Sequence, residues 1–270
     1  MRQSASSHKF HGQMSESFLT AAILSVSGGL QDAYTYISRG KVFANAQTGN
    51  IVLFSQCLID RDFSRSIHYL VPLLFFAFGV AAAEIVRQKF QAAKWIHWRQ
   101  LVLFMEIVLL FLVGFLPDTW NLLANAVVSF SCAMQVQAFR KVNGYAFAST
   151  MCIGNLRSGV ESLCAYGRTH DKKILRKALY YFAIIVMFGL GAGFGGHLIA
   201  VCGFRTIWIS CGLLFVNFLF LFIQEEIEEH PEIREDEKEI SNNLHHIKEE
   251  TEEVEHIIAE DLRLPHSKQK

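Results

Sequence analysis

The strongest constraint on the fold is a short pattern that the chain contains twice. Gly49-Asn50 returns as Gly154-Asn155, 105 residues later. Upstream of each pair, a Ser-x-Ser sequence followed by a Gln recurs at nearly the same offset, at residues 25–31 and 129–135. Two homologous halves with interrupted segments at matching positions are typical of membrane transporters built from repeats. The sequence therefore predicts a duplicated membrane protein with a binding site near the repeated pairs.

Eight apolar segments predict where helices cross or enter the membrane. Hydrophobic residues make up 51% of the chain, above the range of typical soluble domains. Crossing about 30 Å of hydrocarbon takes about 20 helical residues. Six segments approach or exceed that length: 17–38, 68–88, 99–116, 120–139, 176–200 and 204–223. The segments at 43–59 and 146–165 hold the Gly-Asn pairs among polar residues, and we expect them to be short, broken or re-entrant.

The placement of basic residues favours six crossings over eight. With six, 13 Lys and Arg residues lie on one side of the membrane and five on the other, whereas eight crossings divide them nine to nine. Because cytoplasmic loops carry an excess of Lys and Arg, the sequence predicts six spans with both termini cytoplasmic. Three spans per half make the second half enter the membrane from the opposite side. The predicted fold is an all-α polytopic membrane protein with an inverted 3+3 repeat, its halves at residues 17–116 and 120–223.

Charge also divides the chain into a membrane domain and a tail. Residues 1–16 form a polar N-terminal tail, and residues 17–223 form the predicted membrane domain. Residues 224–270 carry 6 basic against 16 acidic residues. Apolar side chains recur there every three or four positions from residue 240, which predicts an amphipathic helix or a short coiled coil that joins copies of the chain into a homo-oligomer. A solvated acidic helix without a partner is the alternative.

The Gly-Asn pairs have the composition of helix starts inside the membrane. Gly permits turns, and Asn and Thr are good N-caps. A helix that begins within the membrane leaves N–H groups without intrahelical partners, and these must be buried in protein or line a wet cavity. They carry the positive end of the helix dipole, which attracts an anion or a carboxylate. We therefore predict that a solute binds at Thr48, Gly49, Asn50, Gly154 and Asn155; the alternative is a pair of tight helix contacts at the glycines.

Ionisable residues inside the predicted spans complete the candidate site. Burying such groups is costly, so they are functional candidates. Asp32, beside Gln31, lies near the end of the first span. Arg157 and Glu161 lie one turn apart on one helix face, where they can pair with each other. We include all four residues in the predicted substrate site, with Arg157 supplying positive charge; Glu106 also falls within an apolar span.

No motif predicts catalysis, a cofactor or a resident metal. The six cysteines form no CxxC and the 11 histidines form no HExxH, so we interpret the cysteines as packing residues. Residues 189–196 contain GxGxxG, but no strand precedes it, and close helix packing through small residues explains it better. Phe78-Gly79 also matches Phe188-Gly189 between the halves. We expect neither enzymatic activity nor binding to nucleic acid.

Three motifs together resemble the YoaK family of bacterial inner-membrane proteins, whose function is largely uncharacterised. They are Ser27-Gly28-Gly29-Leu30-Gln31-Asp32-Ala33, Thr48-Gly49-Asn50 and Gly154-Asn155-Leu156. The resemblance covers about residues 17–223 and leaves the acidic tail outside. The second motif of the family usually reads Thr-Gly-Asn, and Ile153 replaces the Thr here. A looser, fold-level analogy relates half-helices with facing N-termini to the core of sulphate-permease-type anion carriers.

These features favour a multi-pass protein of the bacterial inner membrane. The leading hypothesis is a secondary transporter or permease for a small anionic or carboxylate-bearing solute, with Arg157 supplying positive charge and Asp32 a proton or polar contact. The second hypothesis is a non-transporting scaffold or sensor that acts through its acidic tail. The expected partners are the lipid bilayer and an unknown small solute.

Overall fold

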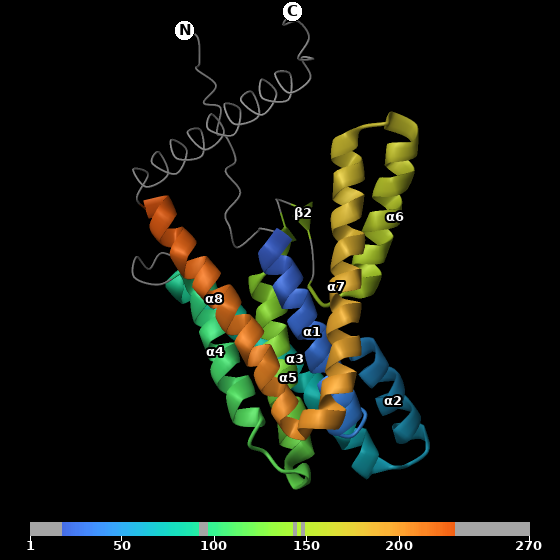
Figure 1. The fold of residues 1–270 in the computed structure, drawn as a ribbon. Coiled ribbons are helices and arrows are strands. Elements are labelled where there is room, and N and C mark those ends of the chain that lie inside the picture. The colour runs from blue at the N-terminus through green and yellow to red at the C-terminus, as the bar shows by residue number, and fades with distance from the viewer. Residues whose placement is uncertain (1–17, 92–96, 143–144, 147–148, 230–270) are drawn as a thin grey trace, which may run out of the picture. The chain divides into compact units, whose positions relative to one another are not determined.

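The computed structural model describes residues 18–91, 97–142, 145–146 and 149–229. In these residues the chain forms eight α-helices (Figure 1). They are α1 (Phe18–Ser38), α2 (Gln47–Ile59), α3 (Phe63–Phe90), α4 (Trp98–Val113), α5 (Asn121–Ala138), α6 (Cys152–Thr169), α7 (Lys172–Cys202) and α8 (Ile207–Glu229). Short 3₁₀ turns, η2 (Asp118–Trp120) and η3 (Gly203–Thr206), precede α5 and α8. An antiparallel pair, β1 (Lys141–Val142) with β2 (Tyr145–Ala146), lies between α5 and α6.

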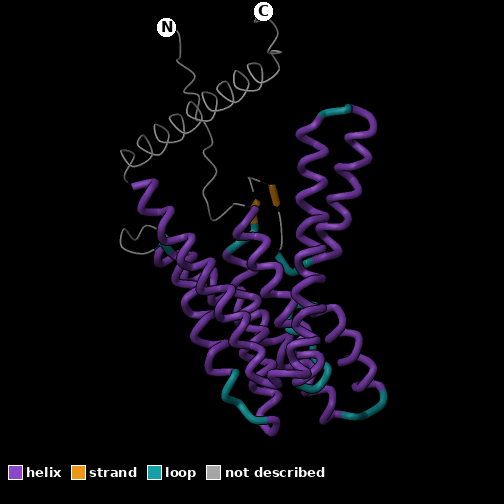
Figure 2. Tube along the Cα trace, in the orientation of Figure 1, coloured by secondary structure: helices purple, strands orange, loops and turns teal. Residues whose placement is uncertain are grey.

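Each predicted apolar segment overlaps one of these helices, so the prediction of a helical protein is confirmed. Within the described residues the small β1–β2 pair is the one departure from an all-α fold (Figure 2). The two weaker segments become helical later than predicted, at Gln47 and at Cys152, because loops precede them. With 13 residues, α2 is too short to cross about 30 Å of hydrocarbon, while α6 has 18.

The two halves pack against each other through reciprocal glycine contacts. Helix α1 packs on α7, and its counterpart α5 packs on α3. A Cβ atom at Gly29 of α1 would lie 2.9 Å from the backbone nitrogen of Ala192, and one at Gly191 would lie 2.8 Å from the Cα atom of Val26. In the other pair of helices, a Cβ atom at Gly79 of α3 would meet the backbone of Phe130. Absence of a side chain therefore allows both helix pairs to approach backbone to backbone.

These contacts correct one detail of the predicted repeat. Val26 and Phe130 occupy the same place in the repeated Ser-x-Ser pattern. Gly191 packs on the first and Gly79 on the second, so these two glycines are structural equivalents. The sequence match paired Gly79 with Gly189, where an added Cβ would meet nothing within 4 Å. That pairing is wrong by two residues, which on a helix is more than half a turn and places the side chain on another face.

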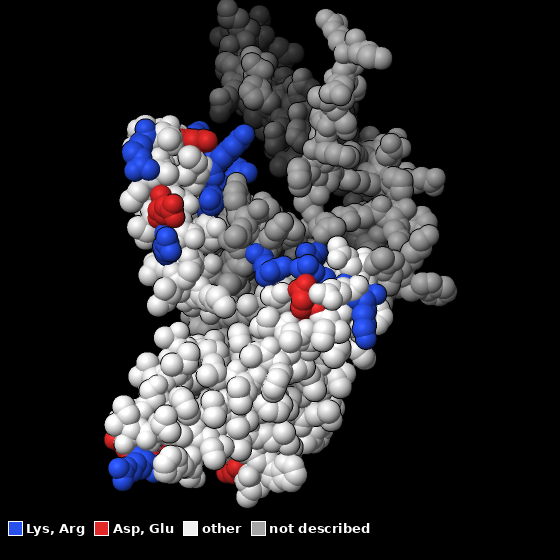
Figure 3. Space-filling view, turned by 180° about the vertical axis from the view of Figure 1, so that it is seen from behind, with Lys and Arg blue, Asp and Glu red and all other residues white. Residues whose placement is uncertain are grey.

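The outer surface of the helices is apolar. Phe78, Phe115, Phe194 and Val201 are each more than half exposed. On the face drawn in Figure 3, a broad uncharged zone lies between charged residues gathered towards its two ends. Among the described residues, α3 and the segment Lys172–Phe222 are long and apolar enough to cross a membrane. This surface is suited to contact with lipid rather than with water.

Helix contacts divide the chain after Leu221 into two units. The first unit contains α1 to α7 and most of α8. Of the second, the structure describes the rest of α8, to Glu229. The amphipathic stripe predicted from residue 240 lies outside the described residues.

Candidate functional site

The loops that precede α2 and α6 meet at one point on α1. The Asn45 side-chain amide donates a hydrogen bond to the carbonyl oxygen of Gly28 at 3.3 Å. From the other loop, the methyl group of Thr150 occupies the space where a side chain at Gly28 would lie. Beyond these loops, α2 and α6 extend towards opposite ends of the bundle (Figure 1). The starts of the two helices that contain the Gly-Asn pairs therefore converge on Gly28.

Asp32 fixes the first of these loops. One carboxylate oxygen accepts a hydrogen bond from the backbone N–H of Asn45 at 2.7 Å, and the amides of residues 44 and 46 also approach this carboxylate. Asp32 is 7% exposed, and the groups that approach its carboxyl group within the described residues are backbone N–H groups and the Asn45 amide. The carboxylate thus satisfies N–H groups that the loop would otherwise bury without partners.

A connected set of buried polar side chains lies next to this point, between α1, α4, α5 and α8. The amide nitrogen of Gln31 donates to Glu106 at 3.3 Å and to Ser210 at 2.9 Å. Ser210 and Ser27 share a hydrogen bond of 2.5 Å between their hydroxyl groups. All four residues are fully buried. We call this set, together with the residues of the next paragraph, the polar cluster.

The second half of the chain contributes matching groups to the polar cluster. Gln135, the counterpart of Gln31, donates its amide to the same Glu106 oxygen at 3.2 Å. The hydroxyl of Ser149 donates to Gln135 at 3.5 Å. The thiol of Cys132 donates to the side-chain oxygen of Gln31 at 2.6 Å. Glu106 Oε1 is therefore held by one amide from each half.

Some polar atoms at this site have no hydrogen-bond partner within the described part of the chain. They are the second carboxyl oxygen of Glu106, the side-chain oxygen of Asn45 and the hydroxyl groups of Ser129 and Ser131. An unsatisfied buried polar atom costs about 1–3 kcal/mol. Unsatisfied polar atoms of this kind, the second oxygen of Glu106 above all, mark a place suited to a ligand or a proton. Among the described residues no three His, Cys, Asp or Glu side chains gather as metal ligands.

The structure brings together only part of the predicted site. Gln31 belongs to the polar cluster, and Asp32 lies one residue further on α1 and holds the loop that reaches Gly28. Asn50 is fully buried, but its amide bonds both backbone groups of Phe43, and Gly49 packs against the ring of the same residue. Thr48 is exposed. The first Gly-Asn pair therefore closes the loop onto α2 instead of facing the polar cluster.

The second Gly-Asn pair differs from the first. An added side chain at Gly154 would meet nothing within 4 Å, whereas Asn155 is buried. Neither pair supplies a cap, because α2 and α6 begin two residues earlier, after Ala46 and Met151, without a side-chain hydrogen bond at either N-cap. The glycines of the repeated pairs are thus not equivalent in packing.

Arg157 and Glu161 lie outside the polar cluster. Both side chains are exposed on α6, and the face of that helix that packs on α7 is formed by residues such as Gly159. Within the described residues the ion pairs are Arg65–Asp62 and Arg87–Glu84, so the predicted pairing of Arg157 with Glu161 does not form.

Comparison with known proteins places the chain in a family. A family model described as protein of unknown function (DUF1275) matches residues 20–220. The chain belongs to this family. It is also 25% identical, over 180 residues, to the UPF0700 transmembrane protein YoaK of Bacillus subtilis (strain 168), a match that covers 63% of this chain and 79% of that relative. No solved structure matches. The resemblance seen in the motifs is confirmed, and this DUF1275 chain is a helical membrane protein.

Sequence reasoning missed Arg39, which it placed in a loop. This guanidinium is fully buried and donates to the hydroxyl of Tyr34 at 2.7 Å and to the carbonyl oxygen of Leu116 at 2.9 Å. It also lies 3.9 Å from the centre of the Phe204 ring. Its donors are used to tie the end of α1 to the end of α4, so this DUF1275 protein employs Arg39 as a structural clamp.

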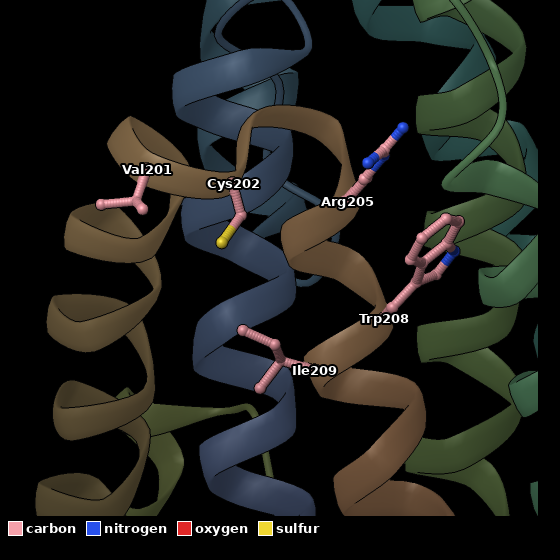
Figure 4. Close-up of a pocket in the computed structure, with 5 residues that line it drawn as sticks. All are labelled: Val201, Cys202, Arg205, Trp208 and Ile209. Carbon is pink, nitrogen blue, oxygen red and sulfur yellow. The ribbon is translucent and has the colours of Figure 1, made fainter.

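A separate hollow of about 610 Å³ opens at the connection between α7 and α8. Its lining consists of Val201, Cys202, Arg205, Trp208 and Ile209 (Figure 4). The indole N–H of Trp208 donates to the carbonyl oxygen of Phe111 at 3.1 Å, and Arg205 lies 6.0 Å from the indole ring. Arg and Trp side chains at helix ends are typical of the membrane–water interface. This hollow shares no residue with the polar cluster.

Proposed function

We propose that this protein is a secondary transporter for a small solute that binds at the polar cluster. The observation that carries the proposal is the placement of a carboxyl group, two side-chain amides and several hydroxyl groups, all fully buried, where both halves of the chain meet. Burying such groups in a membrane protein is costly, and functional sites are where that cost is met. Among the described residues the cluster pairs no nucleophile with a base, so we propose transport rather than enzymatic activity.

The proposed topology has six spans in an inverted repeat, namely α1, α3, α4, α5, α7 and α8. Two observations support it: the reciprocal packing of α1 on α7 and of α5 on α3, and the opposite courses of α1 and α5 along the bundle (Figure 1). Helices α2 and α6 are then broken segments that start inside the membrane. By the count of basic residues, both termini face the cytoplasm. The similarity to a transmembrane protein of Bacillus subtilis supports a location in the bacterial cell (inner) membrane.

Reporter fusions test this topology directly. Fusions after Pro117 should report the periplasmic side and fusions after Lys94 the cytoplasmic side. The reverse pattern would contradict the six-span arrangement.

The charges at the polar cluster favour a neutral or cationic solute over an anion. The predicted anionic preference followed from the helix starts at the Gly-Asn pairs and from Arg157. The first pair closes a loop onto α2, and the Arg157 side chain is exposed on α6. In the cluster itself, Glu106 accepts hydrogen bonds from amides, and the described residues place no Lys or Arg in hydrogen-bond contact with it. A solute that offers hydrogen-bond donors complements free carboxyl and hydroxyl oxygens.

A screen for thermal stabilisation of the purified protein is the experiment that identifies the solute. A ligand that binds the native state raises the free energy of unfolding by an amount set by its concentration relative to its Kd. We expect Gln135→Leu, and the milder Ser149→Ala, to weaken this stabilisation and the flux of the same solute into proteoliposomes. Arg157→Gln is the matched control and should retain both. Unchanged binding in both cluster variants, or loss only in the control, would refute the assignment of the site.

The alternative of a scaffold or sensor depends on the acidic tail. The observation that favours it is the charge of residues 224–270, which carry 6 basic against 16 acidic residues. Deletion of residues 225–270 discriminates between the two functions. A transporter retains solute flux without the tail, whereas a scaffold loses its partner.

A further inference from the structure

Equivalent positions in the two halves carry different chemistry. Ser27 of α1 and Ser210 of α8 bond to each other through their hydroxyl groups. In the repeat, Ser131 is the counterpart of Ser27, as Gln135 is of Gln31. The same offset relates Ser210 to Glu106. A carboxyl group on α4 thus stands where the other half has a hydroxyl group.

The register of α4 against α5 places Glu106 level with Ser131. The Arg99 guanidinium donates to the carbonyl oxygen of Ala138 at 3.1 Å, which aligns the start of α4 with the end of α5. These two helices are joined by a short connection and run antiparallel. Glu106 lies seven residues, or about two turns, from that contact along α4, and Ser131 lies seven residues from it along α5. Ser131, Gln135 and Ala138 also share one face of α5, because they are four and three residues apart.

The equivalent pairs differ in how their polar atoms are satisfied. Ser27 and Ser210 satisfy each other, whereas the second oxygen of Glu106 and the hydroxyl of Ser131 are both fully buried and without a partner in the described part of the chain. The first oxygen of Glu106 already accepts from Gln31 and Gln135. One atom of the carboxyl group is therefore anchored, and the other has no partner. The Ser131 hydroxyl belongs to the facing helix but is not hydrogen-bonded to it.

We propose that Glu106 is the proton-binding site of this protein, with Ser131 as the group that accepts the hydrogen bond of the protonated carboxyl. The proposal rests on the proposed transport function and names its coupling ion. A proton needs one oxygen to carry it and one to accept its hydrogen bond. The unpartnered oxygen of Glu106 is the first, and Ser131 becomes the second when protonation draws the two side chains together, since they are not hydrogen-bonded in this structure. A metal cation requires more oxygen ligands than these.

Of the two carboxyl groups near the polar cluster, Glu106 is the one that is available to bind a proton. The titratable groups that approach it from the neighbouring helices are the thiols of Cys132 on α5 and Cys211 on α8. On α1, Gln31 faces Glu106, while the Asp32 carboxylate is held by the backbone of the loop before α2. Protonation removes the charge of Glu106, and both amide hydrogen bonds to its other oxygen remain possible.

Charge movement in proteoliposomes on a solid-supported membrane tests the proposal without knowledge of the solute. A rapid change of pH, with no solute present, should displace charge in the wild-type protein as protons bind. Glu106→Gln should abolish this signal, and so should Glu106→Ser, which recreates the Ser27–Ser210 pair of the other half. Ser131→Ala should weaken it. Glu84→Gln is the control and should preserve it, because Glu84 is paired with Arg87 at 3.2 Å on α3.

Four outcomes would overturn the proposal. The first is a signal of wild-type size in both Glu106 variants, and the second is its loss in Asp32→Asn alone. The third is a displacement that follows a jump in Na⁺ concentration at constant pH and depends on Glu106, since that would identify a metal cation as the ligand. Solute flux in a wild-type protein that shows no pH-driven signal would refute proton binding and leave the proposed transport intact. Conversely, a proton signal that depends on Glu106 in a protein without flux would contradict transport alone.

Discussion

The glycine contact between α1 and α7 gives the sharpest quantitative prediction for stability. A Cβ atom at Gly191 would lie 2.8 Å from the Cα atom of Val26, and the carbonyl oxygen of the same residue is closer still. Ordinary contact begins at 3.4 Å, so Gly191→Ala forces the two helices apart by at least 0.6 Å. Both obstacles are backbone atoms, which cannot rotate away. We therefore expect the upper end of the usual overpacking cost, about 3 kcal/mol.

Gly189→Ala is the matched control on the same helix. Gly189 is exposed, and an added methyl group meets nothing within 4 Å. Replacing Gly by Ala inside a helix favours the helix by about 1 kcal/mol, and this gain is common to both variants. The difference between them thus isolates the packing term. Gly191→Ala should unfold with a free energy lower than that of Gly189→Ala by about 3 kcal/mol.

Unfolding of the purified protein in detergent, followed by tryptophan fluorescence, measures this difference. Gly29→Ala should behave like Gly191→Ala, because its Cβ atom would lie 2.9 Å from the nitrogen of Ala192. The double variant should cost less than the sum of the two, since helices that have already separated accommodate the second methyl group. Equal stability of the Gly189 and Gly191 variants would refute the reasoning.

Two further predictions concern buried polar groups. Asp32→Ala should lower the free energy of unfolding by about 1–3 kcal/mol, because it leaves the N–H of Asn45 buried without an acceptor. Asp32→Asn retains an acceptor and should lower it by less in the same denaturation assay. Arg39→Lys should lower it by about 2 kcal/mol or more, since one ammonium nitrogen cannot replace both the Nη2 bond to the Tyr34 hydroxyl and the Nη1 bond to the Pro117 carbonyl. A melting curve that matches the wild type would show that the guanidinium is not a clamp.

Hydropathy and the repeat predicted the helices well, because apolar length and a duplicated motif are local properties of the chain. Gln31 and Asp32 were also predicted, since polar residues within an apolar helix are costly and rarely incidental. Arg157 satisfied the same criterion, yet its side chain is exposed on α6. The difference arises from which face of each helix packs against a neighbour, and neither spacing nor composition determines that.

The sequence indicated that Glu106 and Gln135 are unusual residues, but not that they contact each other. Glu106 lies in an apolar segment, and Gln135 is the counterpart of Gln31 in the repeat. Their meeting depends on the register of α4 against α5, which Arg99 and Ala138 align in three dimensions. Arg39 gave no such signal, because a basic residue after a span resembles any loop charge until its carbonyl partners are known.

The scaffold of the two halves is reciprocal, but their chemistry is not. Gly191 packs on Val26 as Gly79 packs on Phe130, so each half offers the other a similar crossing. The carboxyl groups come from the first half alone: Asp32 corresponds to Val136, and Glu106 to Ser210. If the halves exchange conformations during transport, as inverted repeats do, the helix crossings remain equivalent while the environment of Glu106 changes from one state to the other. A single carboxyl group placed off the symmetry of its scaffold would then bind its proton in one environment and release it in another, on different sides of the membrane.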